Sequence, residues 1–174
     1  MTPRIPPARM QVWRDFLRAH ARLTEVLCRE LERERGLPLP WYDVLVTLSE
    51  APDGRLRMGE LAAAVAFSRS GLTRLVDRMA AGGLVTRRRA TTDRRVTFAE
   101  LTAEGRNVLR RAAPTHLRGV DAYFTALVGE DEAQMLHRFF TRVLDRLDRL
   151  DQLDRLDQLD RREHLDVAAE AHVS

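Results

Sequence analysis

The stretch between residues 57 and 102 constrains the fold of this chain most strongly, because its local signals follow one another in a recognisable order. Residues 58–65 have the apolar spacing of a helix, a break follows at residues 66–68, and a second helical pattern covers residues 70–81. The pair Gly82-Gly83 is expected to end this second helix, since glycine is a poor helix former. Two short helices joined by a tight turn are therefore predicted.

Two strand-like segments follow the second helix. They cover residues 84–89 and 94–101, and the polar residues 90–93 are expected to form the turn between them. The order of helix, turn, helix and hairpin predicts a winged helix-turn-helix, a shape that can read duplex DNA. We therefore predict a mainly α fold with a small β-hairpin wing.

The second helix of this motif carries the side chains that a DNA-reading helix needs. Short hydroxyls fit close to a groove, arginine can donate two hydrogen bonds to guanine, and the amides of a helix N-terminus bind phosphate. The residues expected on its exposed face are Ser68, Arg69, Ser70, Thr73, Arg74, Asp77 and Arg78. The opposite face is apolar and consists of Leu72, Leu75, Val76 and Met79. The alternative interpretation is an ordinary solvated amphipathic helix.

The predicted hairpin is strongly basic. Between residues 84 and 96 it contains five arginines and one acid, a local excess that attracts a polyanion. The arginines are Arg87, Arg88, Arg89, Arg94 and Arg95, and the acid is Asp93. Arginine at a narrow hairpin tip can enter the minor groove, where the negative potential is deep. Asp93 is expected to pair with a nearby arginine or to cap the turn amides, and the alternative is a surface ion pair of little energetic weight.

The composition sets the broad class of protein. A chain of 174 residues is long enough for one domain with its own core, or for a domain with extensions. The net charge is only +3, so the argument for nucleic acid rests on local rather than overall charge. The sequence shows no secretory signal and no apolar run of membrane-spanning length, which predicts a cytoplasmic protein that does not enter a membrane.

No catalytic or metal-binding pattern is evident in the sequence. Phosphate-binding glycine loops, nucleophile elbows and metalloprotease motifs are missing, so we expect no enzyme activity and no cofactor. The five histidines do not have the spacing of a zinc cage, although a metal-responsive site built across helices is an alternative. Cys28 is the only cysteine, which excludes an intramolecular disulfide and suggests a small buried apolar side chain.

Helical patterns flank the central motif on both sides. A long helix is expected up to Gly36, a second one covers residues 41–50, and a third runs over residues 102–127 with a bend or break near Pro114. A last helix begins near residue 129 and leads into a repeat in which leucine recurs every three residues. Such leucines go around a helix and form no heptad seam. This end of the chain is interpreted as a partly ordered extension, with an added partner helix as the alternative.

The chain resembles the MarR (multiple antibiotic resistance regulator) family of transcription factors over about residues 8–148. The helix-turn-helix sequence GELAAAVAFSRSGLTRLVDRMAAGGLV, the wing signature Asp93-Arg94-Arg95 and the closing LTAEG carry the resemblance. The flanking helices agree as well, with LPLPWYDVLVTLSEAP before the motif and RRAAPTHLRGV after it. The resemblance implies a ligand-responsive homodimer, most simply a repressor, that binds a pseudo-palindromic operator in double-stranded DNA.

The resemblance also implies a domain organisation and roles for single residues. Residues 1–36 would form an N-terminal dimerisation helix, 37–101 the DNA-binding domain, 102–148 the C-terminal dimerisation helices and 149–174 the Leu-Asp-Arg extension. The helix at residues 68–78 would enter the major groove. In the wing, Asp93 would brace Arg95 for the minor groove, and Arg94 would contact phosphate or the groove.

A small aromatic ligand is a further implication of the resemblance, because such ligands bind between the dimerisation helices and the winged module of this family. The residues expected to line its pocket are Trp13, Phe16, His20, Trp41 and Tyr42. The alternative is that these aromatic side chains are simply part of the core. A second reading of the whole chain is a helical module that binds a ligand or a protein partner and contacts DNA only weakly.

Overall fold

The computed structural model describes residues 4–65, 67–89 and 96–171, and within these ranges all side chains except those of Arg69, Asp151 and residues 154–171. The chain divides into two compact units, residues 1–125 and 126–174. The predicted residues 90–95 of the wing tip lie outside the described ranges. Among the described residues, no helix is long and apolar enough to cross a membrane.

The first unit begins with two helices that start at prolines. Helix α1 spans Pro7–Arg35, and Gly36 ends it in the left-handed conformation with φ of 60°. Helix α2 spans Leu39–Glu50 and has Pro40 in its first turn, where a missing N–H is tolerated. The expected helices are confirmed, and α2 begins two residues earlier than the apolar pattern indicated.

The helix-turn-helix is also present. Helix α3 spans Met58–Ala64 and helix α4 spans Arg69–Ala81. The hydroxyl of Ser68 accepts a hydrogen bond from the N–H of Gly71 at 3.1 Å, which satisfies one of the amides that the first turn leaves open. This cap explains why α4 begins one residue earlier than the periodicity predicted.

A three-stranded antiparallel sheet completes the motif. Strands β1 (Arg55–Arg57), β2 (Val85–Arg89) and β3 (Thr97–Leu101) lie in the order β1-β3-β2. The hairpin prediction is confirmed for β2 and β3, which pair from Val85 opposite Leu101 to Arg89 opposite Thr97. Strand β1 was not predicted, because three residues are too few to show an alternating pattern.

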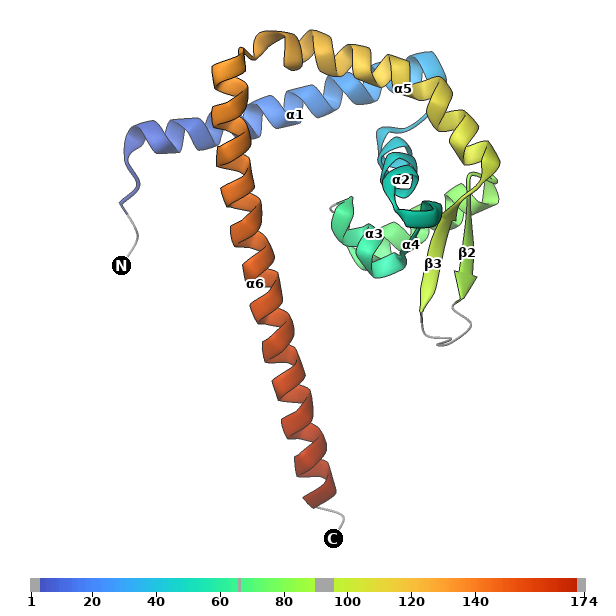
Figure 1. Ribbon diagram of the computed structural model, residues 1–174, viewed down its shortest axis with the longest axis vertical. Coiled ribbons are helices and arrows are strands. Elements are labelled where there is room, and N and C mark those ends of the chain that lie inside the picture. The colour runs from blue at the N-terminus through green and yellow to red at the C-terminus, as the bar shows by residue number, and fades with distance from the viewer. Residues whose placement is uncertain (1–3, 66, 90–95, 172–174) are drawn as a thin grey trace. The chain divides into compact units, whose positions relative to one another are not determined.

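The core of this unit lies between the helices and the sheet (Figure 1). Its most deeply buried side chains come from α1, α2, α3, α4 and β2, namely Leu31, Val44, Leu45, Leu48, Leu61, Leu72, Val76, Met79 and Val85. The predicted apolar face of α4 is confirmed, since Leu72, Leu75, Val76 and Met79 are all buried. Burial of this face holds the other face of α4 outward.

Helix α5 spans Ala103–Tyr123 and lies beside α1 (Figure 1). The hydroxyl of Thr102 accepts a hydrogen bond from the N–H of Gly105 at 2.9 Å, which confirms Thr102 as the N-cap. The helix passes through Pro114 without ending, which confirms the expected long element at this residue and makes the alternative of a break there wrong. It ends earlier than residue 127, and a short 3₁₀ turn, η2, follows at Thr125–Leu127.

The second unit is helix α6, which spans Glu130–Ala171 and includes the leucine repeat. Three acidic residues occupy its first turn, Glu130, Asp131 and Glu132, where they interact favourably with the positive end of the helix dipole. The extension expected to be partly ordered is helical through Ala171. Its leucines at 144, 147, 150 and 153 are all half or more exposed within the chain.

Candidate nucleic-acid interface

Helix α4 presents a polar, basic face to solvent. Ser68, Ser70, Arg74 and Arg78 are exposed, and Thr73 is half-buried. Neither Arg74 nor Arg78 forms an ion pair with another residue in the described ranges. Both guanidinium groups are therefore available for phosphate or base edges.

The arginines of β2 are in different states. Arg87 forms an ion pair with Asp77 of α4 at 2.5 Å, and Arg88 forms one with Glu100 of β3 at 3.0 Å. Arg89 is exposed and has no ion pair among the described residues. Carboxylates thus already offset two of the three positive charges on this strand. The sequence prediction had assigned the same DNA-binding role to all three arginines.

The pair between Asp77 and Arg87 ties helix α4 to the wing. Sequence reasoning placed Asp77 on the exposed face and Arg87 in the DNA-binding set, and the structure brings them together. The contact could not be read from the sequence, because it depends on how β2 packs beside α4. The remaining wing residues of the prediction, Asp93, Arg94 and Arg95, lie outside the described residues, as does the side chain of Arg69.

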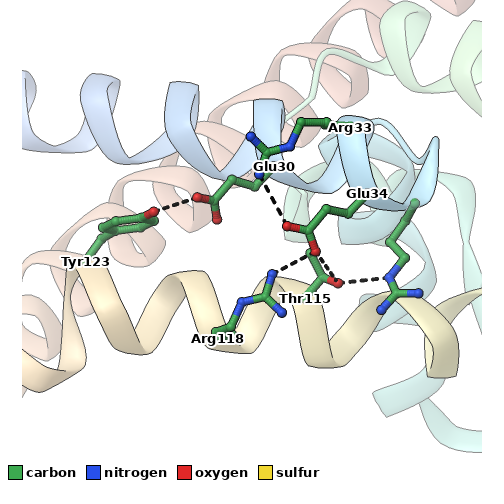
Figure 2. A network of polar contacts seen from close by, with 7 residues as sticks. Glu30, Arg33, Glu34, Thr115, Arg118 and Tyr123 are labelled. Carbon is green, nitrogen blue, oxygen red and sulfur yellow. Dashed lines mark hydrogen bonds and ion pairs between the residues drawn. The ribbon is translucent and has the colours of Figure 1, made fainter.

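A polar network joins α5 to α1 behind the DNA-binding motif (Figure 2). Arg118 of α5 donates a hydrogen bond to Glu34 of α1 at 2.7 Å, and Tyr123 donates one to Glu30 at 2.5 Å. On the side of Arg118 away from Tyr123, the buried hydroxyl of Thr115 accepts a hydrogen bond from Arg35 and donates one to Glu34 (Figure 2). The Arg118 hydrogen bond is the main reason that the pKa of Glu34 is lowered.

This network lies between two helices that lead to the winged motif. Strand β3 leads directly into α5, whose N-cap hydroxyl also lies 2.9 Å from the carbonyl oxygen of Leu84 at the start of the hairpin. Helix α1 leads into α2, which packs against the motif core. Helices α1 and α5 are thus each connected to one end of the winged motif.

The five aromatic residues predicted to line a ligand pocket do not line one common cavity in the structure. Trp13, Phe16 and His20 are exposed along α1, with ring centroids 6.0 and 6.2 Å apart for successive pairs. Trp41 is half-buried and packs against the motif core. Only Tyr42 lines the cavity of about 460 Å³ that lies between α2, the end of α3 and α5.

The residues of that cavity were largely missed by sequence reasoning. Its lining consists of Tyr42, Asp43, Val46, Thr47, Ala64, Val65, His116 and Leu117. The rings of Tyr42 and His116 pack together with centroids 4.4 Å apart. Asp43 and Thr47 share a face of α2 at a spacing of four residues, but nothing in the sequence shows that α5 lies opposite.

Cys28 is half-buried, and the pKa of its thiol is raised mainly by burial and secondarily by the charges of Asp43 and Glu32. A raised pKa reduces the thiolate fraction and therefore the reactivity of the group. No group of three metal-ligating side chains occurs within the part of the chain that the structure describes.

Comparison with known proteins identifies the family. A MarR family model matches residues 35–96, which include α2, the helix-turn-helix and β2. A transcriptional repressor of Bacillus subtilis, YetL, is 32% identical over 113 residues, covering 65% of this chain and 67% of the repressor. The chain belongs to the MarR family. The Escherichia coli repressor MprA is also similar, with 28% identity over 68% of this chain and 66% of its own.

Solved structures of MarR family regulators have the same fold. AbsC from Streptomyces coelicolor is 32% identical and superposes with a TM-score of 0.77, covering 84% of this chain and 98% of AbsC. A second regulator from the same organism, solved in complex with DNA, is 35% identical with a TM-score of 0.77 and covers 83% and 91%. Both likenesses extend well beyond the winged motif itself.

Proposed function

We propose that this MarR family protein is a sequence-specific DNA-binding transcriptional regulator that acts as a homodimeric repressor. The observation that carries the proposal is the exposed face of α4. Ser70, Arg74 and Arg78 lie along this face, and the apolar face of the helix is buried. Arg89, exposed on the neighbouring strand, adds a positive charge that has no ion pair among the described residues. A regulator 35% identical to this chain has been solved bound to DNA.

The dimer is supported by apolar side chains that are exposed on each of the two units, taken by itself. On α1, Trp13 is 54% exposed and Phe16 is 42% exposed. On α6, which belongs to the second unit, Met135 is 57% exposed and Phe139 is 42% exposed. Exposed apolar faces of this extent are typical of surfaces that a partner covers. A two-fold dimer would place its two α4 helices for half-sites about one helical turn, ~34–36 Å, apart.

The proposal contains no catalytic step and no cofactor. The curated relatives are transcriptional regulators, and the sequence lacks the phosphate-binding, nucleophile and metal motifs of the common enzyme classes. Under this proposal the protein works in the cytoplasm, on double-stranded DNA. A small ligand would modulate its affinity for that DNA.

The proposal can be tested by fluorescence anisotropy with duplex DNA from upstream of the protein's own gene and with random duplex as competitor. We expect saturable binding that resists the competitor. Arg74→Ala should weaken binding by ~1–3 kcal/mol if Arg74 contacts a base. Arg22→Ala is the matched control, because Arg22 is exposed on α1 and outside the proposed interface.

Two results would contradict the proposal. One is equal affinity for upstream and random DNA, followed by failure to select any preferred sequence from a random library. The other is equal loss of affinity in Arg74→Ala and Arg22→Ala, which would show a general charge effect in place of a recognition helix.

A further inference from the structure

The cavity between α2, the end of α3 and α5 is a candidate site for the small ligand of the proposed function. Its volume of about 460 Å³ is within the usual range of small-molecule sites. The apolar part of its wall comes from all three helices, with Val46 on α2, Val65 at the end of α3 and Leu117 on α5. An occupant of this cavity would touch each of the three elements.

Asp43 is the charged group of this cavity. Its carboxylate is half-buried and makes no hydrogen bond or ion pair with any other described residue. Burial raises the pKa of Asp43. A partly buried carboxylate that has no hydrogen-bond donor among the described residues can accept a charge-assisted hydrogen bond from a ligand cation.

The charged side chains that shift the pKa of Tyr42 and of Cys28 near Asp43 are all acidic, although the protein as a whole is basic. Asp43 and Glu50 both raise the pKa of the neighbouring Tyr42 hydroxyl, after the larger effect of burial. Asp43 and Glu32 do the same for the thiol of Cys28. An anionic ligand would therefore be repelled at this end of the cavity, whereas a cation would be attracted.

The remaining polar groups fit an aromatic ligand. Tyr42 and His116 present two packed rings, against which an apolar ring or an organic cation can stack. The pKa of His116 is lowered by burial, so its imidazole is neutral at neutral pH and does not offset Asp43. Thr47, one turn after Asp43 on α2, adds a hydroxyl that can donate or accept.

We propose that this cavity binds a small organic cation, a protonated amine on an aromatic or apolar body, whose ammonium group donates a hydrogen bond to the carboxylate of Asp43. The ring of the ligand would lie against Tyr42, His116 and Val46. This ligand class is opposite in charge to aromatic acids, which the acidic side chains around Asp43 disfavour.

The position of the cavity also gives the ligand a route to the recognition helix. Val65 is the C-cap of α3, the N–H of Phe67 donates to the carbonyl of Ala62, and Ser68 then caps α4. A ligand that contacts Val65 and His116 together would bias the position of the turn relative to α5. This regulatory part of the inference rests on the proposed function, whereas the binding site itself does not.

The binding site is tested by calorimetric titration of the full-length protein, without DNA, using phenethylamine and phenylacetate. These two probes have the same ring and similar length but opposite charge at neutral pH. We expect phenethylamine to bind the wild-type protein and phenylacetate to bind at least about tenfold more weakly, as for loss of a charge-assisted hydrogen bond. Equal binding of the two probes, or tighter binding of phenylacetate, would overturn the proposal, as would no binding of phenethylamine.

Two variants locate the interaction. Asp43→Asn keeps the size of the side chain and should weaken phenethylamine by about tenfold or more, while the control Asp15→Asn on α1 should not. Unchanged affinity in Asp43→Asn would overturn the proposal, and the wild-type comparison of the two probes decides it if that variant fails to fold. DNA affinity is measured separately by anisotropy, so failure of the ligand site and failure of the proposed function are distinguishable.

Discussion

Asp77→Asn is expected to strengthen the attraction of this protein for DNA of any sequence. Asp77 holds Arg87 at 2.5 Å, and their side chains are 51% and 37% exposed. Removing the carboxylate releases one guanidinium group per protomer on the surface that carries the exposed arginines of α4. If each released Arg87 then contacts a phosphate, a dimer gains two phosphate contacts.

The magnitude follows from counterion release. Each added phosphate contact steepens the dependence of log affinity on log salt by about 0.9, so two contacts add ~1.8 to the slope. Between 50 and 200 mM salt, the variant should therefore lose about 12-fold more affinity than the wild-type protein loses. The stability of the fold should change little, because an exposed ion pair contributes only ~0.2–1 kcal/mol.

The assay is an anisotropy titration with random duplex DNA at four or more salt concentrations. The matched control is Asp15→Asn, which changes the net charge by the same amount at an exposed position on α1. A slope for Asp77→Asn that equals the slopes of the control and the wild-type protein would refute the reasoning. It would mean that Arg87 does not face DNA, with or without its partner.

Three other predictions concern the fold that positions the interface. Leu72→Ala removes a fully buried side chain of α4 and should lower the free energy of unfolding by ~2–5 kcal/mol in chemical denaturation. Gly105→Ala would place a Cβ 2.1 Å from the carbonyl oxygen of Leu84, so denaturation should show a loss of ~1–3 kcal/mol or more, with unchanged stability as the contrary result. Burial raises the pKa of Asp43 in the folded state, so ionised Asp43 destabilises the fold at neutral pH. Asp43→Asn should therefore raise the free energy of unfolding at pH 7. This gain should shrink as the pH falls through the pKa of Asp43 in the folded state. A gain independent of pH would contradict the last prediction.

The sequence predicted the elements whose signals are local. Apolar spacing placed α1, α3 and α4, and the hydroxyl of Thr102 marked the start of α5. The buried face of α4 was predicted residue by residue, since a periodicity of 3.6 determines which side chains share a face. Strand β1 escaped prediction because it is defined by pairing with β3, not by its own three residues.

The site was predicted less completely, because its geometry depends on contacts between distant segments. The expected basic face of α4 follows from the sequence, but the pairing of Arg87 with Asp77 and of Arg88 with Glu100 does not. The same holds for the cavity, where α2 and α5 place Asp43 and His116 on one wall although 72 residues lie between them in the chain. Of the aromatic residues predicted for the ligand pocket, only Tyr42 lines the cavity, and no signal in the sequence pointed to Asp43.

The proposed function requires that two copies of α4 read two related half-sites in DNA. The most direct measurement is selection of preferred binding sites from a random duplex library, carried out in parallel with the wild-type protein and Arg74→Ala. We expect the wild-type protein to enrich an inverted repeat whose half-site centres lie about one helical turn, ~34–36 Å, apart, and the variant to lose preference at one position in each half. Enrichment of no repeat, or of the same repeat with unchanged preference by both proteins, would contradict the account.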